Sequence, residues 1–236
     1  MRAAPAAPCL DLIPLQPDLR VEGPIAAPLA WRRGEIGPAD WTLPLDEAAR
    51  AELRGIAEFV RREPLPTYLL APEHFALPAC RAAMAETRRR LEDGIGIVLL
   101  EGFPLDGLAP EEVRAAYWVL GRLLAVPVAA KWDGTVLYDV RDSGREYGIG
   151  VRASLTRHEL EFHTDNTFAQ APPDYISLLC LQPAARGGVS RVASFYALHN
   201  RLRAGQPALL ERLYRPFYYD RQLEHPPGEP RVSRSR

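Results

Sequence analysis

The hydrophobic pattern of this 236-residue chain changes its period near Lys131, and this change constrains the fold more than any other feature. Before it, apolar residues recur every three or four positions, which predicts amphipathic helices. After it, short alternating apolar runs between glycines predict strands and turns, among them 135–141, 175–182 and 190–194. Helices followed by strands favour an α+β domain with N-terminal helices packed on the outside of a sheet.

Three long helices are predicted in the first half of the chain. The first follows Asp46, a residue suited to cap a helix, and ends before Pro64. The second covers about 78–91 and ends in consecutive arginines, and the third begins near Pro110. Between the last two, the glycine-bounded run 96–102 predicts a short buried strand.

Further elements are expected near the C-terminus. Ser194 is a candidate cap for a helix through Leu202, and residues 207–220 predict a short helix and then a strand. The last residues, 224–236, are rich in proline and arginine and lack the alternation of a strand.

Residues 1–45 hold eight of the 23 prolines, a density that disfavours helices and central strands. We expect a Pro-rich arm of loops and edge strands that packs on the body through Trp31 and Trp41, with a loose arm as the alternative. Residues 46–236 are predicted to form the main domain.

Composition excludes several classes of protein. The chain is 47% hydrophobic and 25% charged, as in ordinary soluble domains, and its net charge of -1 gives no reason to expect nucleic acid or an anionic membrane as partner. No apolar run is long enough to cross a bilayer, and prolines interrupt the N-terminus before a signal-peptide core could form. We expect a cytoplasmic enzyme with a small-molecule substrate, and the oligomeric state is left open.

His163 and Asp165 form the candidate metal site. Two residues apart on an extended chain, their side chains project from the same side and can bind one ion. Ferrous iron accepts an imidazole nitrogen and a carboxylate oxygen, and oxygen activation needs coordination positions left open. On the opposite side, Leu160, Phe162 and Thr164 are expected to face an apolar core.

The surroundings of this pair carry a family resemblance. In the run 151–194, the segment FHTDNTF is followed by Pro172 and Pro173, an apolar strand and a Gly-Gly-x-Ser turn at 187–190. This run resembles the taurine dioxygenase (TauD/TfdA) family of iron(II)- and 2-oxoglutarate-dependent oxygenases. Weaker similarity to the same family is found elsewhere, for example at residues 94–104. In total the resemblance covers about two thirds of the chain.

The resemblance implies a double-stranded β-helix, or jelly roll, of the clavaminate synthase-like type. It implies that His163 and Asp165 are the first two iron ligands and that the Ser190 hydroxyl helps to bind 2-oxoglutarate. The implied cofactors are Fe²⁺, 2-oxoglutarate and O₂, and the implied reaction is hydroxylation of a small organic substrate. Because Asp165 is present, hydroxylation is favoured over halogenation.

The resemblance also implies a third, distal histidine ligand and, after it, an arginine that binds the cosubstrate. His225 is the last histidine, but its surroundings do not predict a strand, so we do not expect it to bind iron. We therefore predict that the last strands of the barrel are missing. We expect these 236 residues by themselves to bind iron weakly and to show little activity.

Other polar residues near the pair have open roles. Glu161 is expected to face solvent, with a hydrogen bond to the His163 imidazole as the alternative. His158 is expected at the surface, with substrate contact as the alternative, and Asn166 and Thr167 suit either a turn or the pocket wall. A non-catalytic jelly-roll binding protein and a cupin-like zinc hydrolase are the alternative functions.

Overall fold

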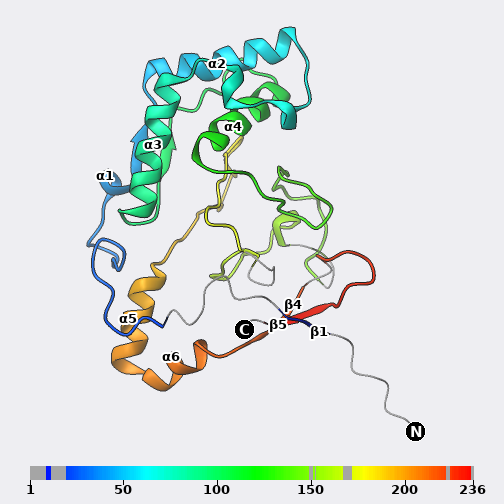
Figure 1. Cartoon of the computed structure of the whole chain (residues 1–236). Helices are drawn as coiled ribbons and strands as arrows, with labels where there is room; N and C mark the ends of the chain where they lie inside the picture. Colours follow the sequence, from blue (N-terminus) through cyan, green and yellow to red (C-terminus); the bar gives the residue numbers. More distant parts are fainter. Residues whose placement is uncertain are drawn as a thin grey trace. The chain divides into compact units, whose positions relative to one another are not determined.

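The fold combines long helices with a few short strands (Figure 1). The computed structural model describes residues 9–11, 20–148, 151, 153–166, 172–221 and 224–234. Its α-helices are α1 (Pro38–Trp41), α2 (Glu47–Arg62), α3 (Pro78–Glu92), α4 (Pro110–Leu124), α5 (Phe195–Gly205) and α6 (Pro207–Leu213). Its strands are β1 (Cys9–Asp11), β2 (Thr42–Pro44), β3 (Leu99–Glu101), β4 (Tyr218–Asp220) and β5 (Val232–Arg234). The 3₁₀ helices are η1 (Thr67–Leu69), η2 (Pro72–His74) and η3 (Ala153–Leu155). The fold class is therefore α+β, as the change of hydrophobic period along the sequence predicts.

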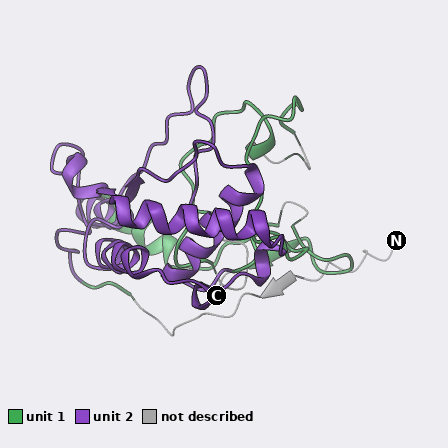
Figure 2. Cartoon of the chain, turned by 90° about the horizontal axis from the view of Figure 1, so that it is seen from above, with its two compact units in different colours: residues 1–22, 128–176, 205–236 green, residues 23–127, 177–204 purple. Residues whose placement is uncertain are grey.

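The chain forms two compact units, both discontinuous in sequence (Figure 2). Unit 1 comprises residues 1–22, 128–176 and 205–236, and unit 2 comprises residues 23–127 and 177–204. The three long helices belong to unit 2. Among the described residues, no helix is both long enough and apolar enough to cross a membrane.

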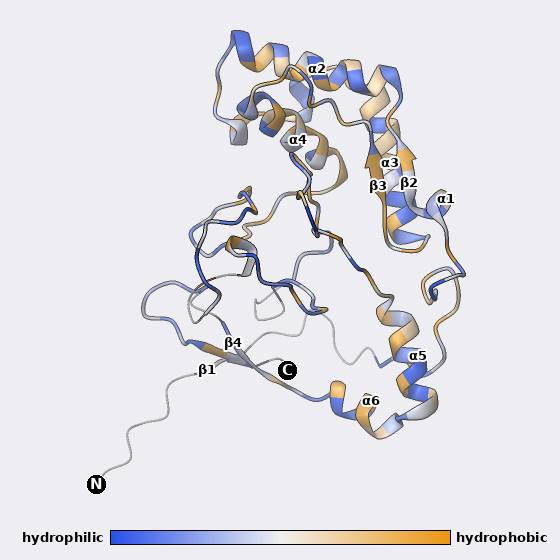
Figure 3. Cartoon of the chain, turned by 180° about the vertical axis from the view of Figure 1, so that it is seen from behind, coloured by the Kyte–Doolittle hydropathy of each residue, from blue (hydrophilic) through white to orange (hydrophobic). Residues whose placement is uncertain are grey.

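Helices α2, α3 and α4 pack on one another and form the apolar core of unit 2 (Figure 1). Along α2, hydrophobic and hydrophilic residues alternate around the helix (Figure 3), and Leu53, Ile56 and Ala57 are at most 1% exposed. The Asp46 side chain accepts a hydrogen bond from Ala49 N at 2.8 Å, which confirms the predicted cap. All three predicted helices are confirmed with ends within two residues of those expected.

Helix α3 takes its N-terminal cap from a different helix. Pro78 at its start has no N–H and Leu77 has no polar side chain, so no local acceptor serves the next amides. The Glu52 carboxylate of α2 accepts hydrogen bonds from Ala79 N at 2.9 Å and Cys80 N at 2.8 Å. Burial, together with the nearby Glu52 carboxylate, raises the pKa of the Cys80 thiol to about 12, so this thiol is an inert part of the core.

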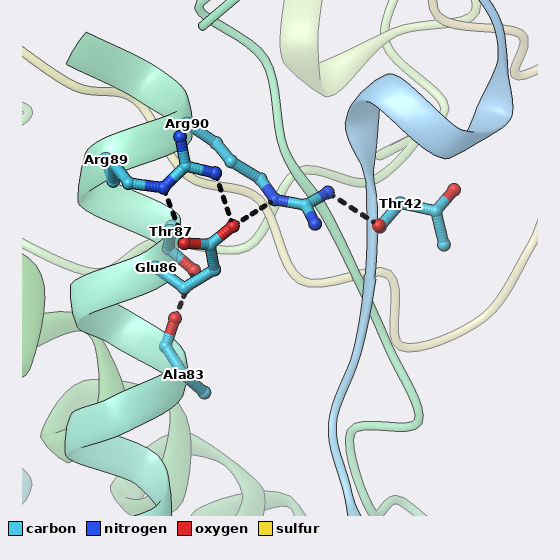
Figure 4. Close-up of polar contacts among 6 residues, drawn as sticks. All are labelled: Thr42, Ala83, Glu86, Thr87, Arg89 and Arg90. Atoms are coloured by element: carbon cyan, nitrogen blue, oxygen red, sulfur yellow. Dashed lines mark hydrogen bonds and ion pairs between the residues drawn. The ribbon is translucent and has the colours of Figure 1, made fainter. Parts of the chain in front are cut away.

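Arginine side chains connect elements of unit 2 through hydrogen bonds to glutamates and to a backbone carbonyl. Arg61 of α2 donates two hydrogen bonds, at 2.7 and 2.9 Å, to the Glu112 carboxylate of α4, and they hold the pKa of Glu112 below its ordinary value. In α3, Glu86 accepts hydrogen bonds from Arg89 at 2.7 Å and Arg90 at 2.8 Å (Figure 4). Arg90 also donates to the Thr42 carbonyl of β2 at 2.9 Å, so it joins α3 to this strand (Figure 4).

Strand β3 confirms the strand predicted in 96–102, but it is not fully buried. It pairs in parallel with β2, in the register Thr42 to Leu99. Leu99 is 51% exposed, because among the described strands this sheet has only β2 and β3, and two strands cannot cover both faces.

Residues 23–45 of the proline-rich segment belong to unit 2 and are bonded to other parts of it. Trp31 Nε1 donates to the Ile95 carbonyl at 2.9 Å, and the Asn200 side chain of α5 bonds both backbone groups of Ile25. Ser194 caps α5 by accepting from Ala197 N and also donates to the Leu29 carbonyl at 2.6 Å. The division into an arm and a domain at residue 45 stays a prediction.

In unit 1, strands β1, β5 and β4 form a sheet in that order, with β1 parallel and β4 antiparallel to β5. Our expectation that 224–236 contains no strand is therefore wrong for Val232–Arg234. Three residues are too few to show alternation, and this strand forms because β1 and β4 bond its backbone on both sides.

The strands predicted at 135–141, 175–182 and 190–194 are also wrong, because none of these segments forms one. Their apolar side chains are exposed: Ile176 by 55%, Leu178 by 78% and Val192 by 60%. A strand requires a neighbouring backbone that bonds its N–H and C=O groups, and no such neighbour is present in the described ranges. The described residues accordingly do not assemble a jelly roll.

We predict that Leu53→Ala lowers the free energy of unfolding by about 2–5 kcal/mol, because it opens a cavity where α2 meets its neighbours. Leu69→Ala is the control, since Leu69 is 63% exposed, and we expect a change of about 0.5 kcal/mol or less. Urea unfolding followed by helical circular dichroism measures both. If both variants lowered the free energy of unfolding by the same amount, the assignment of Leu53 to the core would be contradicted.

We predict that the stabilisation by Glu86 depends on pH. Hydrogen bonds from Arg89 and Arg90 lower the pKa of Glu86 from 4.5 to about 2 in the folded chain. A lowered folded-state pKa stabilises the fold above pH 4.5, and this contribution disappears as the pH falls towards 2. Glu86→Gln should therefore unfold at lower urea than the parent at pH 6, with a difference that shrinks below pH 4.5.

The matched control for this titration is Glu63→Gln. Glu63 is exposed, lies just after α2 and has no ion pair in the described part of the chain. We expect its urea midpoint to follow the parent at every pH. If the Glu86→Gln difference stays constant down to pH 2, the ion pairs of Glu86 do not stabilise the fold.

Candidate metal centre

His163 and Asp165 point towards one another in unit 1. The distance from His163 Nε2 to Asp165 Oδ1 is 3.2 Å, and their side chains are 49% and 51% exposed. The segment is not a strand but ends in a turn at 165–166, where Asn166 takes a φ of 55° that asparagine tolerates. The two groups are therefore brought together by a turn and remain open to solvent. Thr167 lies outside the described residues.

A backbone carbonyl determines which nitrogen of His163 is free. His163 Nδ1 lies 2.7 Å from the carbonyl oxygen of Glu161. Because a carbonyl can only accept, Nδ1 is the donor in this contact, and Nε2 is the nitrogen that faces Asp165. The alternative that the Glu161 side chain bonds the imidazole is wrong: this partner is its main chain, and the side chain is exposed.

The two donor atoms fit adjacent positions around one metal ion. For metal–nitrogen and metal–oxygen bonds of about 2.1 Å at a right angle, the donors lie about 3 Å apart. The observed separation of 3.2 Å is close to this value. One neutral nitrogen and one carboxylate oxygen form a donor set that ferrous iron accepts. A contact between two half-exposed groups also leaves room for further ligands.

No third protein ligand joins the pair within the ranges that the structure describes, where no three His, Cys, Asp or Glu side chains could hold a metal together. His225 is half-buried in the loop between β4 and β5, and its Nδ1 bonds the Pro226 carbonyl at 3.0 Å. Its Nε2 is buried without a hydrogen-bond partner among the described residues, and the expectation that His225 is not the third ligand stays a prediction.

The prediction that Leu160, Phe162 and Thr164 face an apolar core is wrong. Leu160 is 51% exposed and Phe162 is 66% exposed, whereas both were expected to be covered. The expectation assumed a strand in a sheet with a layer beneath it. Without a strand at 160–164, the opposite side of the segment has no layer to pack on.

Ser190 follows a turn that depends on two glycines in unit 2. Gly187 and Gly188 have φ values of 76° and 68°, in the region that disfavours other residues. A Cβ on Gly188 would also approach the Ala184 side chain to 3.0 Å. Ser190 itself is exposed. Because Ser190 belongs to unit 2 and the metal pair to unit 1, its contact with 2-oxoglutarate stays a prediction.

The sequence analysis missed a pocket whose lining residues come before His163 in the chain. It is lined by Asp142, residues 144–147 and residues 156–158, and the rings of Tyr147 and His158 stack with their centroids 4.2 Å apart. In sequence this stretch shows only a glycine-rich turn with mixed charges. His158 is at the surface as expected, although its stacking partner is eleven positions away and gave no local signal.

An imidazole and a carboxylate that converge on one point, in an α+β chain, define a candidate mononuclear metal protein. The family model described as taurine catabolism dioxygenase TauD, TfdA family matches residues 61–236, which include His163, Asp165 and Ser190. This chain belongs to that family, as the resemblance of its His-Thr-Asp segment indicates.

Two characterised sequences are similar to the chain over most of its length. It is 32% identical over 215 residues to FR-33289 synthase of Streptomyces rubellomurinus, covering 90% of this chain and 62% of that protein. It is 26% identical over 225 residues to the taurine hydroxylase-like protein SAT17 of Stachybotrys chartarum, covering 89% and 55%. The chain thus spans less than two thirds of the length of either relative.

We predict that His163→Ala weakens binding of Fe²⁺ to the apoprotein at least tenfold, because it removes one of two protein donors. Anaerobic calorimetry measures this affinity without requiring turnover. His74→Ala is the control, since the His74 ring accepts a bond from Ala71 N in unit 2 and should not affect the metal. Equal affinity in parent and His163→Ala would show that the pair does not bind iron.

Proposed function

We propose that the chain is an iron(II)- and 2-oxoglutarate-dependent dioxygenase that hydroxylates a small organic substrate. The observation that carries this proposal is the convergence of His163 Nε2 and Asp165 Oδ1, within a region that matches an oxygenase family. The word hydroxylase in the name of the second relative supports hydroxylation as the reaction.

The residues have separate tasks in this reaction. Bound iron supplies the activation of oxygen, which is coupled to decarboxylation of 2-oxoglutarate. His163 would bind iron through Nε2, and the Glu161 carbonyl holds the ring in the required tautomer. Asp165 would add an anionic oxygen, and the Ser190 hydroxyl would donate to a carboxylate of the cosubstrate.

The jelly roll also belongs to this proposal. The family match supports it, and the exposed apolar runs of the chain suit the inner faces of such a barrel. A barrel would give the metal pair a wall that keeps water from the reacting carbon.

A non-catalytic jelly-roll binding protein is the second candidate. It is favoured by the lack of a third protein ligand among the described side chains, because two donors hold iron more weakly than three. In this case His163 and Asp165 would be retained without turnover.

We expect iron and 2-oxoglutarate, added without oxygen, to give the visible charge-transfer band of the ternary complex at high iron concentration. The band should be lost in Asp165→Ala and weakened in Ser190→Ala. After oxygen is admitted, we expect little succinate, because only two of the implied three ligands come together among the described residues. His74→Ala serves again as the unaffected control.

Two outcomes would change the proposal. If no band forms at any iron concentration, the dioxygenase assignment fails and the binding protein is favoured. If turnover is fast and is lost in His225→Ala, His225 is the third ligand, contrary to its place in the loop between β4 and β5.

A further inference from the structure

Residues 23–30 run beside helix α5 and are tied to it by hydrogen bonds (Figure 1). The Asn200 side chain of α5 accepts a bond from Ile25 N at 2.8 Å and donates one to the Ile25 carbonyl at 2.7 Å. Just before α5, the Ser194 hydroxyl donates to the Leu29 carbonyl at 2.6 Å. We call residues 23–30 the N-terminal strap. All of these residues belong to unit 2, so the contacts lie within one compact unit.

The strap is fixed at its C-terminal end and has little conformational freedom. Trp31 directly follows it, and Trp31 Nε1 donates to the Ile95 carbonyl, after α3, at 2.9 Å. Within the strap, the rings of Pro24 and Pro28 restrict two φ angles. The strap therefore connects α5 to the loop between α3 and β3, and it can hold the start of α5 in one place.

Ser194 is the residue through which the strap fixes the start of α5. Its hydroxyl oxygen accepts a hydrogen bond from Ala197 N at 3.0 Å, which caps the helix, while the hydroxyl donates to the strap. Ser190 precedes Ser194 by only four residues. Four residues of extended chain span at most about 14 Å, so Ser190 lies within that distance of a fixed point.

The residues around Ser190 give it little other support. Val189 is 81% exposed and Val192 is 60% exposed, so neither side chain packs firmly on the rest of unit 2. Ser190 itself is exposed. Its position therefore depends on the glycine turn at 187–188 before it and on the attachment of Ser194 after it.

We propose that the N-terminal strap positions the hydroxyl of Ser190 for 2-oxoglutarate, with Asn200 and Ser194 as positioning residues. The inference rests on the proposed function, in which the Ser190 hydroxyl donates to a carboxylate of the cosubstrate. Such a donor has to be held within about 0.5 Å of its productive position, and supporting hydrogen bonds achieve this. Asn200 and Ser194 act through Ser190 and do not themselves contact the cosubstrate.

The test is a titration of 2-oxoglutarate into the full chain, saturated with Fe²⁺ and kept free of oxygen. Asn200→Ala loses both bonds to Ile25, and we expect it to weaken 2-oxoglutarate binding by about fivefold or more. Ser194→Ala should act in the same way, whereas Ser194→Thr keeps the hydroxyl and should bind as the parent does. The affinity for Fe²⁺, measured beforehand by calorimetry, should be the same in the parent and in every variant.

Phe195→Ala is the matched control. Phe195 follows Ser194 on α5 and is 62% exposed, and its side chain has no polar group that could bond the strap. This substitution removes more atoms than Asn200→Ala does. We nevertheless expect Phe195→Ala to bind 2-oxoglutarate as tightly as the parent.

A double-mutant cycle separates positioning from a general loss of structure. In Ser190→Ala the hydroxyl is absent, so adding Asn200→Ala should weaken 2-oxoglutarate binding further by only about twofold or less. A second measurement needs neither iron nor cosubstrate: NMR relaxation of the backbone amides. We expect the order parameter of the Ser190 amide to be lower in Asn200→Ala than in the parent.

Three results would overturn the proposal. The strap does not position Ser190 if Asn200→Ala binds 2-oxoglutarate as the parent does. The role of Asn200 is only structural if its loss is equally large with and without the Ser190 hydroxyl, or if Fe²⁺ affinity falls to the same extent. If the parent itself binds no 2-oxoglutarate, the proposed function fails, and the relaxation data still decide whether the strap holds the segment that carries Ser190.

Discussion

Mutual burial of the apolar faces of α2, α3 and α4 is the interaction that holds unit 2 together. Leu53 and Ile56 of α2 and Val119 of α4 are almost fully covered, and polar contacts at the edge of this core set the order of the helices. Glu52 caps α3, and Glu112 pairs with Arg61. Both oxygens of each carboxylate accept hydrogen bonds, which offsets part of the cost of removing the charge from water.

The candidate metal centre depends on local geometry instead of a packed core. A turn brings Asp165 to His163, and a main-chain carbonyl two residues earlier selects the imidazole tautomer. Such a centre needs few contacts, which explains how its two donors are in place although the strands expected around them are not formed. The contacts of Ser143 with Leu155 and of Tyr147 with His158 are likewise made within a short stretch of chain.

The helices were predictable because their hydrogen bonds and their apolar stripes lie within a single segment. The Asp46 and Ser194 caps were equally readable, since each bonds an amide three residues away. Strands were predicted less well, although β3 and β4 were expected, because alternation shows that 175–182 could be a strand but does not supply the neighbour that must bond it. For the same reason Val232–Arg234 escaped prediction: its pairing with β1 joins residues far apart in the chain.

By itself the amino-acid sequence determined the helical first half, the candidate ligands His163 and Asp165, and membership of an oxygenase family. These follow from residue type and short spacing, which a linear pattern contains. Only the tertiary structure decided that the Glu161 carbonyl orients the imidazole, that Glu52 caps a helix other than its own, and that Arg145 and Glu146 share a pocket with stacked rings. Each depends on the path of the backbone in space, because the atoms that meet are placed by turns and helix packing that no short pattern encodes.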